Sequence, residues 1–98
     1  MKFEEVLPAL KDGERLVNST LSNMNAFIVR QVPQIVPAEV VPKMTSLPDS
    51  AKEHMKGSEI SYQDQVLLMW WSDMQERYIA TNYIPTWGDI FREDWTIA

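Results

Sequence analysis

Cysteine is absent from this chain of 98 residues. Its absence excludes a disulfide framework, a thiol nucleophile and any cysteine-ligated metal site, and it fits a reducing compartment. Glycine occurs only at Gly13, Gly57 and Gly88, so there is no glycine-rich phosphate loop of the dinucleotide or P-loop type. Histidine occurs once, at His54 among charged neighbours. A catalytic triad or a histidine metal site would therefore depend on that residue alone.

Basic residues and long apolar runs are also scarce. Nine Lys and Arg stand against fourteen Asp and Glu, a formal net charge of −5. This sign repels the phosphate backbone and argues against DNA or RNA as a partner. No stretch approaches the roughly 20 apolar residues that span a bilayer, and no apolar run follows a basic N-terminal cluster. We expect a soluble intracellular protein with no membrane partner.

What the chain does contain is a heavy load of large apolar side chains. Hydrophobic residues make up 45% and charged residues 23%, which is typical of a globular protein. The length predicts one domain covering residues 1–98. Four Trp, three Tyr, three Phe and six Met exceed what so small an interior needs. Some of them are expected at a subunit interface or a ligand, where aromatic residues and Met are enriched.

The first half of the chain predicts one helix and a few strands. Apolar residues recur at helical spacing from residue 3 to residue 10, Gly13 suits a left-handed C-terminal cap, and Pro8 is the discordant residue. Residues 14–20 suit a short edge strand followed by a turn. Residues 25–32 alternate as a strand with Phe27 and Val29 on one side and Ile28 on the other. Prolines bracket residues 35–41, which are either an edge strand or an extended connection.

The second half predicts a short helix and a hairpin. Ser46 and Asp49 have capping-box spacing at the start of a helix that ends near Gly57. Residues 60–71 form the longest strand, apolar on both faces from residue 66, which suits a central strand or a subunit interface. Residues 77–84 return after a turn, Thr86 caps a short turn or helix with Asp89, and residues 95–97 form a last strand. The fold class is α+β, a small antiparallel sheet with an N-terminal helix and a short second helix packed on it.

Aromatic residues are the best candidates for a ligand site, because nucleobases bind mainly by stacking on aromatic faces. The candidates are Phe27, Trp70, Trp71, Tyr83, Trp87 and Trp95, each of which, taken alone, is more often a core residue. Trp70 and Trp71 are adjacent on a strand, so they must point to opposite faces. Asn25 is expected on the face of Phe27, where its amide suits base edges and ribose hydroxyls.

Four polar positions have both a structural and a functional interpretation. Thr86 and Asp89 are first of all a helix cap, but a capped N-terminus is also an anion site where the Thr86 hydroxyl can face a pyrophosphate. Glu93 and Asp94 are paired carboxylates, yet neighbours on a strand point apart, which argues against joint acid–base catalysis. We find no catalytic residues, no metal ligands and no cofactor site.

Four strings in fixed order resemble a family of small phage proteins, the second type of Thoeris anti-defence protein: FEEVLPALKDG (3–13), MTSLP (44–48), ISYQDQ (60–65) and DIFREDW (89–95). The resemblance implies α+β subunits that form homotetramers with pockets at subunit junctions. These pockets hold glycocyclic ADP-ribose, and some relatives sequester cyclic dinucleotides. It also implies action in the cytoplasm of an infected bacterial host.

Carried over to this chain, the resemblance points to Phe27 with Asn25 as one side of the pocket. Trp70 or Trp71 supplies a second stacking wall, and Asn82 and Asp94 supply polar contacts. The chain departs from the family at residues 21–23, where many relatives carry a Trp-centred loop, and this leaves the preferred ligand open. The sequence thus predicts a sponge that sequesters a cyclic nucleotide signal without cleaving it. Two alternatives stay open, a phosphodiesterase-like enzyme that degrades the signal, and a protein–protein inhibitor or structural phage protein.

Overall fold

The computed structural model describes residues 1–98 and divides the chain into two compact units. The sheet unit contains residues 1–31 and 65–98, and the ribbon unit contains residues 32–64. Helices and antiparallel strands occur together, which confirms the predicted α+β class. None of the helices has the length and apolar character that crossing a bilayer requires.

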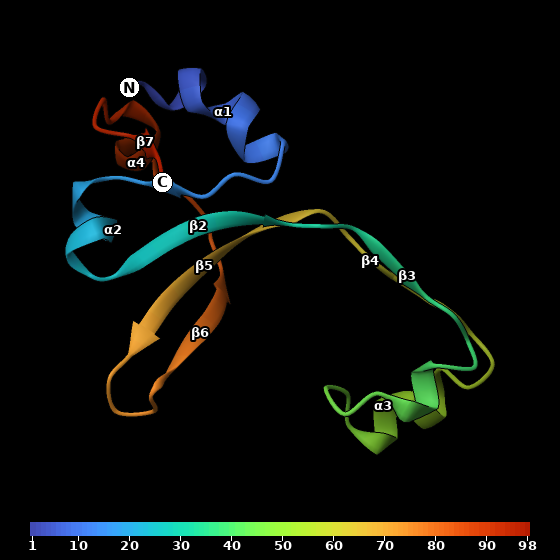
Figure 1. The fold of residues 1–98 in the computed structure, drawn as a ribbon. Coiled ribbons are helices and arrows are strands. Elements are labelled where there is room, and N and C mark those ends of the chain that lie inside the picture. Colours follow the sequence, from blue (N-terminus) through green and yellow to red (C-terminus); the bar gives the residue numbers. More distant parts are fainter. The chain divides into compact units, whose positions relative to one another are not determined.

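The sheet unit is built on a five-stranded antiparallel sheet with the order β6-β5-β2-β1-β7 (Figure 1). Its strands are β1 (Leu16–Val17), β2 (Ala26–Gln31), β5 (Gln65–Ser72), β6 (Arg77–Asn82) and β7 (Thr96–Ile97). The apolar run of β5 lies between β2 and β6, so the predicted central strand and its hairpin partner are both confirmed. The prediction of one strand over residues 60–71 was wrong, because residues 60–62 belong to a separate two-stranded sheet. The polar residues Gln63 and Asp64, which suit a strand poorly, separate the two strands.

The register divides the side chains of the sheet between two faces. Ile28 pairs with Leu68 and Ala26 with Trp70. These residues point to the face that packs against the hydrophobic core, here called the core face. Phe27 pairs with Met69 and Trp71 with Tyr78, and these point to the opposite side, here called the second face. The prediction that Trp70 and Trp71 face opposite ways is confirmed.

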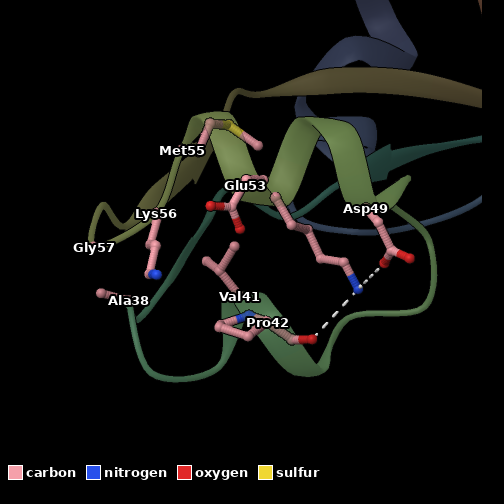
Figure 2. Close-up of a pocket in the computed structure, with 9 residues that line it drawn as sticks. Ala38, Val41, Pro42, Asp49, Glu53, Met55, Lys56 and Gly57 are labelled. Carbon is pink, nitrogen blue, oxygen red and sulfur yellow. Dashed lines mark hydrogen bonds and ion pairs between the residues drawn. The ribbon is translucent and has the colours of Figure 1, made fainter.

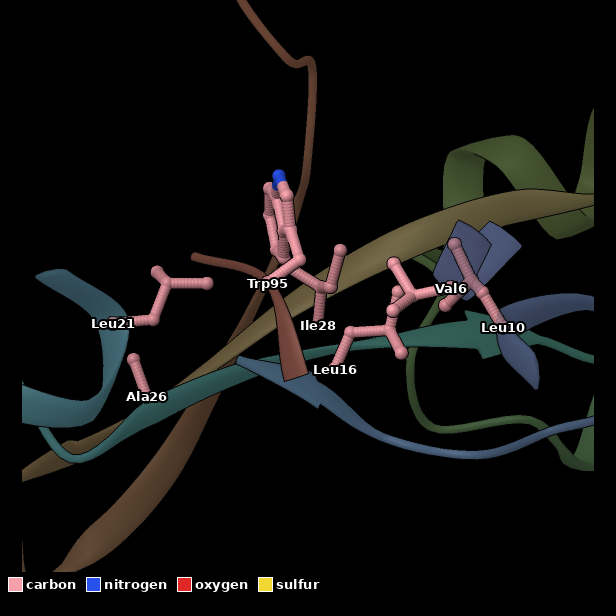
Figure 3. Close-up of a cluster of buried hydrophobic side chains, with 7 residues drawn as sticks. All are labelled: Val6, Leu10, Leu16, Leu21, Ala26, Ile28 and Trp95. Carbon is pink, nitrogen blue, oxygen red and sulfur yellow. The ribbon is translucent and has the colours of Figure 1, made fainter. Parts of the chain in front are cut away.

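The hydrophobic core lies on the core face, where two helices meet the sheet. Figure 3 shows its seven buried residues: Val6 and Leu10 from α1 (Phe3–Lys11), Leu16 from β1, Leu21 from α2 (Ser19–Asn23), Ala26 and Ile28 from β2, and Trp95. Trp95 is 0% exposed, and its ring meets that of Phe3 edge-on with centroids 5.3 Å apart. Trp95 is thus a core residue and not a base-stacking surface.

Helix α1 begins and ends as the sequence predicts. Val6 and Leu10 are buried, Glu4 and Glu5 lie in the first turn, and Pro8 is accommodated inside the helix. Gly13 has a φ of +93°, the left-handed conformation expected after the C-terminus. The N-terminal ammonium donates hydrogen bonds to the carbonyls of Glu93 and Trp95 at 2.9 and 2.7 Å, so the two ends of the chain are joined.

Three predictions in the first third of the chain were wrong. The strand expected over residues 14–20 covers only Leu16–Val17, and it is interior to the sheet because it pairs with both β2 and β7. The following turn is helix α2, whose N-cap Asn18 accepts a hydrogen bond from the Leu21 N–H at 2.9 Å. Asn25 lies before β2 with a φ of +50°, so it does not share the strand face of Phe27.

The ribbon unit contains a two-stranded ribbon and short helical segments. β3 (Gln34–Val36) pairs with β4 (Ile60–Tyr62). The 3₁₀ turn η1 (Val41–Lys43) and α3 (Asp49–His54) lie between these two strands in the sequence. The predicted capping box of α3 does not form, because Pro48 occupies the N-cap without a side-chain bond. The helix is held instead by Lys52, whose Nζ donates to the carbonyls of Met44 and Pro42 at 2.9 and 3.3 Å.

Candidate functional site

Phe27, Trp71 and Tyr78 form an aromatic cluster on the second face of the sheet. They come from the three adjacent strands β2, β5 and β6. Tyr78 is the central member, with its ring centroid 5.3 Å from that of Trp71 and 5.9 Å from that of Phe27. The interplanar angles are 70° and 58°, so ring edges meet ring faces. Strand alternation and the hairpin register together place these rings side by side.

Charged groups stand at the rim of the aromatic cluster. The Arg15 guanidinium carbon lies 5.1 Å from the centroid of the Phe27 ring, a cation–π distance. The indole Nε1 of Trp71 donates a hydrogen bond to Asp73 Oδ1 at 2.8 Å, which fixes the orientation of that ring. Arg15 is exposed and is therefore available to a phosphate as well as to the ring.

The aromatic cluster is only partly covered within the chain. Phe27 and Trp71 are half-buried, and Tyr78 retains 46% of its exposure. Leu67 and Met69, which share this face, are also half-buried. A partly open wall of three aromatic rings beside a guanidinium suits a ligand with a planar base and a phosphate.

Trp70 takes no part in this cluster. It packs against the buried core on the opposite face of the sheet, in the register position opposite Ala26. Of the two tryptophans proposed for the second stacking wall, Trp71 is the one that the structure brings to Phe27 and Tyr78.

The two predicted amides lie at the margins of the second face. Asn82 is exposed at the end of β6 and pairs with Leu67, two residues along β5 from the Met69 position. Asn25 is exposed in the turn before β2, and its carbonyl accepts the Trp71 N–H at 3.3 Å. Asn25 is thus bonded to the backbone of Trp71 and not to its ring.

Thr86 and Asp89 form the predicted capping box of α4 (Trp87–Phe91). Asp89 N–H donates to Thr86 Oγ1 at 3.1 Å, and Thr86 N–H donates to Asp89 Oδ2 at 2.9 Å. The bond from the Thr86 backbone lowers the pKa of Asp89, and a further bond from Tyr83 acts in the same direction. Burial, together with the charge of Asp89, raises the pKa of Tyr83 to about 12. Both hydrogen bonds of this capping box are thus made between groups of the chain itself.

Asp94 joins the C-terminal segment to the start of α2. Arg92 binds its carboxylate in a bidentate manner, with Nε 2.8 Å from Oδ1 and Nη2 2.7 Å from Oδ2. Ser19 donates its N–H to Oδ2 at 3.1 Å and its hydroxyl to the same oxygen. The Arg92 bonds, with those from Ser19, hold the pKa of Asp94 far below its usual range. This carboxylate closes the N-terminus of α2.

The predicted site residues therefore fall into separate groups. Phe27 and Trp71 are brought together, Asn25 and Asn82 border the same face, and Trp70 points away from it. Thr86, Asp89 and Asp94 belong to a polar network near α4. Sequence reasoning missed Tyr78, Arg15, Arg92 and Ser19 as members of these groups. It named Tyr83 as a stacking candidate but missed its hydrogen bond to Asp89. Tyr78 could have been found from the hairpin, had the turn length between β5 and β6 been known.

Two cavities lie outside the aromatic cluster. Figure 2 shows the one in the ribbon unit, of about 290 Å³, between η1 and α3, with Val41 and Met55 as apolar lining and Lys56 and Glu53 as charged lining. The second, of about 400 Å³, lies between α1 and α4 in the sheet unit. Its lining comprises Lys2, Phe3, Glu4, Leu7, Ile90, Phe91, Arg92 and Glu93. No predicted ligand-binding residue lines either cavity, and no group of acidic or histidine side chains is arranged to hold a metal ion.

Comparison of the chain with known proteins identifies a family. Among curated proteins, no sequence matches the chain. The family model of the Thoeris anti-defense 2-like (Tad2-like) domain matches residues 1–98, which is the whole chain. That membership supports a role against Thoeris defence. The chain belongs to the Thoeris anti-defense 2-like family.

Proposed function

We propose that this protein is a non-enzymatic sponge that binds and sequesters a cyclic nucleotide immune signal. Glycocyclic ADP-ribose is the first ligand proposed, and cyclic dinucleotides are the second. By lowering the free signal in the cytoplasm of an infected bacterium, the phage protein would keep the Thoeris effector inactive. The protein would act as a homotetramer that holds the ligand at subunit junctions.

The observation that carries this proposal is the aromatic cluster of Phe27, Trp71 and Tyr78 beside Arg15. Stacking of a base on an aromatic ring contributes about 1–3 kcal/mol. A sponge that competes with an effector needs nanomolar affinity, about −12 kcal/mol. Two stacked groups supply only part of this energy, so further contacts are needed, and we propose that a second subunit provides them.

The Asp89 and Asp94 carboxylates support binding rather than catalysis. A general acid or base works best with a pKa near the working pH. Asp89 and Asp94 both have lowered pKa values because hydrogen bonds stabilise their ionised forms. Both are committed to helix ends, which leaves neither poised to transfer a proton at neutral pH.

The test is recovery of the ligand after capture. Purified protein is incubated with glycocyclic ADP-ribose, washed, heat-denatured, and the supernatant is analysed by liquid chromatography and mass spectrometry. A sponge returns the intact nucleotide in molar proportion to its sites, whereas a phosphodiesterase-like enzyme returns cleaved product. Phe27→Ala should return less ligand, while Trp87→Ala, which alters a ring 72% exposed on α4, should return the wild-type amount.

A protein that blocks Thoeris signalling but retains no nucleotide would contradict the sponge. That outcome would favour the protein–protein inhibitor, for which the exposed, stacked rings of Trp87 and Phe91 are a suitable surface. Their centroids are 5.8 Å apart, and both side chains are 72% exposed.

A further inference from the structure

β6 is a free edge of the five-stranded sheet. It pairs only with β5, and five of its six residues are exposed. Proline, bulges and central charges are the usual protections of a free edge. β6 has none of these, since its register with β5 is regular and its one charged residue, Arg77, stands at its start. Such an edge can accept another strand.

Alternate residues of β6 point their backbone groups to opposite sides. The Tyr83 N–H donates to the Val66 carbonyl at 2.8 Å just beyond the strand, which identifies the odd-numbered residues as those bonded to β5. In an antiparallel ladder the residues between them direct N–H and C=O away from that neighbour. These are Tyr78, Ala80 and Asn82, and no backbone hydrogen bond from elsewhere in the chain reaches them.

We propose that β6 pairs antiparallel with β6 of a second copy of this chain, about a two-fold axis at Ala80. The pairing places the partner's Asn82 beside Tyr78, where it completes the aromatic cluster. It depends on the proposed function for the identity of the ligand, but not for the contact between strands.

The register of the proposed β6–β6 pair follows from the backbone N–H and C=O groups that point away from β5. A two-fold axis perpendicular to the sheet keeps each side chain on its own face, so paired residues must share a face. Centring on Ala80 pairs Tyr78 with the partner's Asn82, Ala80 with the partner's Ala80, and Asn82 with the partner's Tyr78. The two residues of each pair exchange two hydrogen bonds. If the two-fold axis passed through a residue next to Ala80 instead, β6 would form one hydrogen-bonded pair fewer. Small side chains then meet at the axis, and no charged residue opposes another.

The pairing adds a polar contact where the aromatic cluster lacks one. Tyr78 touches both Phe27 and Trp71, and all three rings point to the second face. Cross-strand neighbours in such pairs have Cβ atoms about 4.5–5.5 Å apart. The partner's Asn82 would therefore stand next to the stacking rings, with an amide donor and acceptor for a base edge or a ribose hydroxyl. Within one chain Asn82 is opposite Leu67, away from the rings.

Charge substitutions at the axis test the contact. Ala80→Lys and Ala80→Glu each place like charges opposite one another in the pair, so each variant alone should show half the wild-type mass by light scattering. A one-to-one mixture opposes Lys to Glu and should regain the wild-type mass, which also shows that both variants fold. Met74→Lys, at a hairpin position that is 97% exposed, is the control and should keep the wild-type mass.

A cysteine at the axis tests the register. Hydrogen-bonded antiparallel partners have Cα atoms about 5.5 Å apart, within the range of a disulfide. Because the chain has no cysteine, Ala80→Cys under mild oxidation should give one covalent dimer. Thr81→Cys, which points to the other face and opposes Ile79, should cross-link far less.

Affinity separates this inference from the proposed function. Variants that lose the pairing should bind glycocyclic ADP-ribose at least about tenfold more weakly, because the amide contact is lost. Wild-type mass in both charge variants, with no covalent dimer of Ala80→Cys, would overturn the pairing. Loss of pairing with unchanged affinity would overturn the role of the partner's Asn82. If the wild-type protein bound no nucleotide while the charge variants still dissociated, the sponge would fail and the pairing would stand.

Discussion

At the scale of single residues, the aromatic side chains divide into ligand-facing and core-forming groups. Phe27→Ala and Tyr78→Ala should each weaken nucleotide binding by about 1–3 kcal/mol, since each removes a stacking surface. Trp95→Ala should instead reduce the free energy of unfolding by about 3–5 kcal/mol, because that ring is fully buried. Isothermal titration calorimetry and thermal melts of each variant measure the two effects. Early melting of Phe27→Ala with no separate loss of affinity would place that ring in the core.

The Asp94 carboxylate gives a prediction on pH. Hydrogen bonds from Arg92 and Ser19 lower its pKa in the folded state, so its contribution to stability is present above the unfolded pKa of about 3.9. As the pH falls below that value toward the folded pKa, the contribution is progressively lost. Asp94→Asn should therefore melt below the wild type at pH 7, and the difference should shrink from about pH 4 downward. A difference independent of pH would show that the contact does not depend on the ionised form.

Sequence reasoning at this scale succeeded where strand alternation alone decided the answer. The opposite orientations of Trp70 and Trp71 followed from their adjacency, and the Thr86 cap followed from spacing. It could not find Tyr78 or Arg15, because their contacts with Trp71 and Phe27 depend on the register between separate strands.

At the scale of elements, the Thr86 cap tests how α4 is held. Thr86→Ala removes the acceptor for the Asp89 N–H and should lower the free energy of unfolding by about 0.5–2 kcal/mol. Thr86→Ser keeps the hydroxyl and is the matched control, with stability close to the wild type. Chemical denaturation at pH 7 measures both. Equal losses in the two variants would show that the methyl group, rather than the hydrogen bond, matters.

Element boundaries were less predictable than element types. Helix α1 and the β5–β6 hairpin were found because their apolar periodicity is strong. Helix α2 was missed because its five residues, Ser19–Asn23, are mostly turn formers, and its stability comes from the Asn18 cap and buried Leu21. The strand at residues 60–62 was joined to β5 because both segments suit extended backbone, and only pairing separates them.

At the scale of the whole molecule, the order of the strands in the sheet could not be predicted from the sequence. β1 has only two residues, yet it pairs with β2 on one side and with the C-terminal strand β7 on the other. Such long-range pairing is set by burial of Leu16 and Trp95 in a shared core, which no local pattern reveals.

The half-covered second face also predicts assembly. If its apolar residues meet another subunit, light scattering at micromolar concentration should give about four times the chain mass of 11.4 kDa, the tetramer of the proposed function. A variant with Met69→Asp in the middle of this face should give a smaller particle, while Met74→Asp at the exposed hairpin turn should not. A wild-type monomer would contradict both the shared pocket and the pairing of β6.

The net charge of −5 sets the last expectation, which concerns salt. An acidic protein cannot hold phosphates by a broad basic surface, so capture must use a few local cations such as Arg15, beside the aromatic cluster. Proteins that neutralise many phosphates lose affinity steeply with salt, whereas one or two ionic contacts give a shallow dependence. Between 50 and 500 mM salt, we expect the dissociation constant for glycocyclic ADP-ribose to rise by less than about tenfold. Arg15→Gln should flatten this dependence further, because it removes the cation and keeps a polar side chain over Phe27. A steep dependence that survives in Arg15→Gln would place the phosphate contacts elsewhere in the protein.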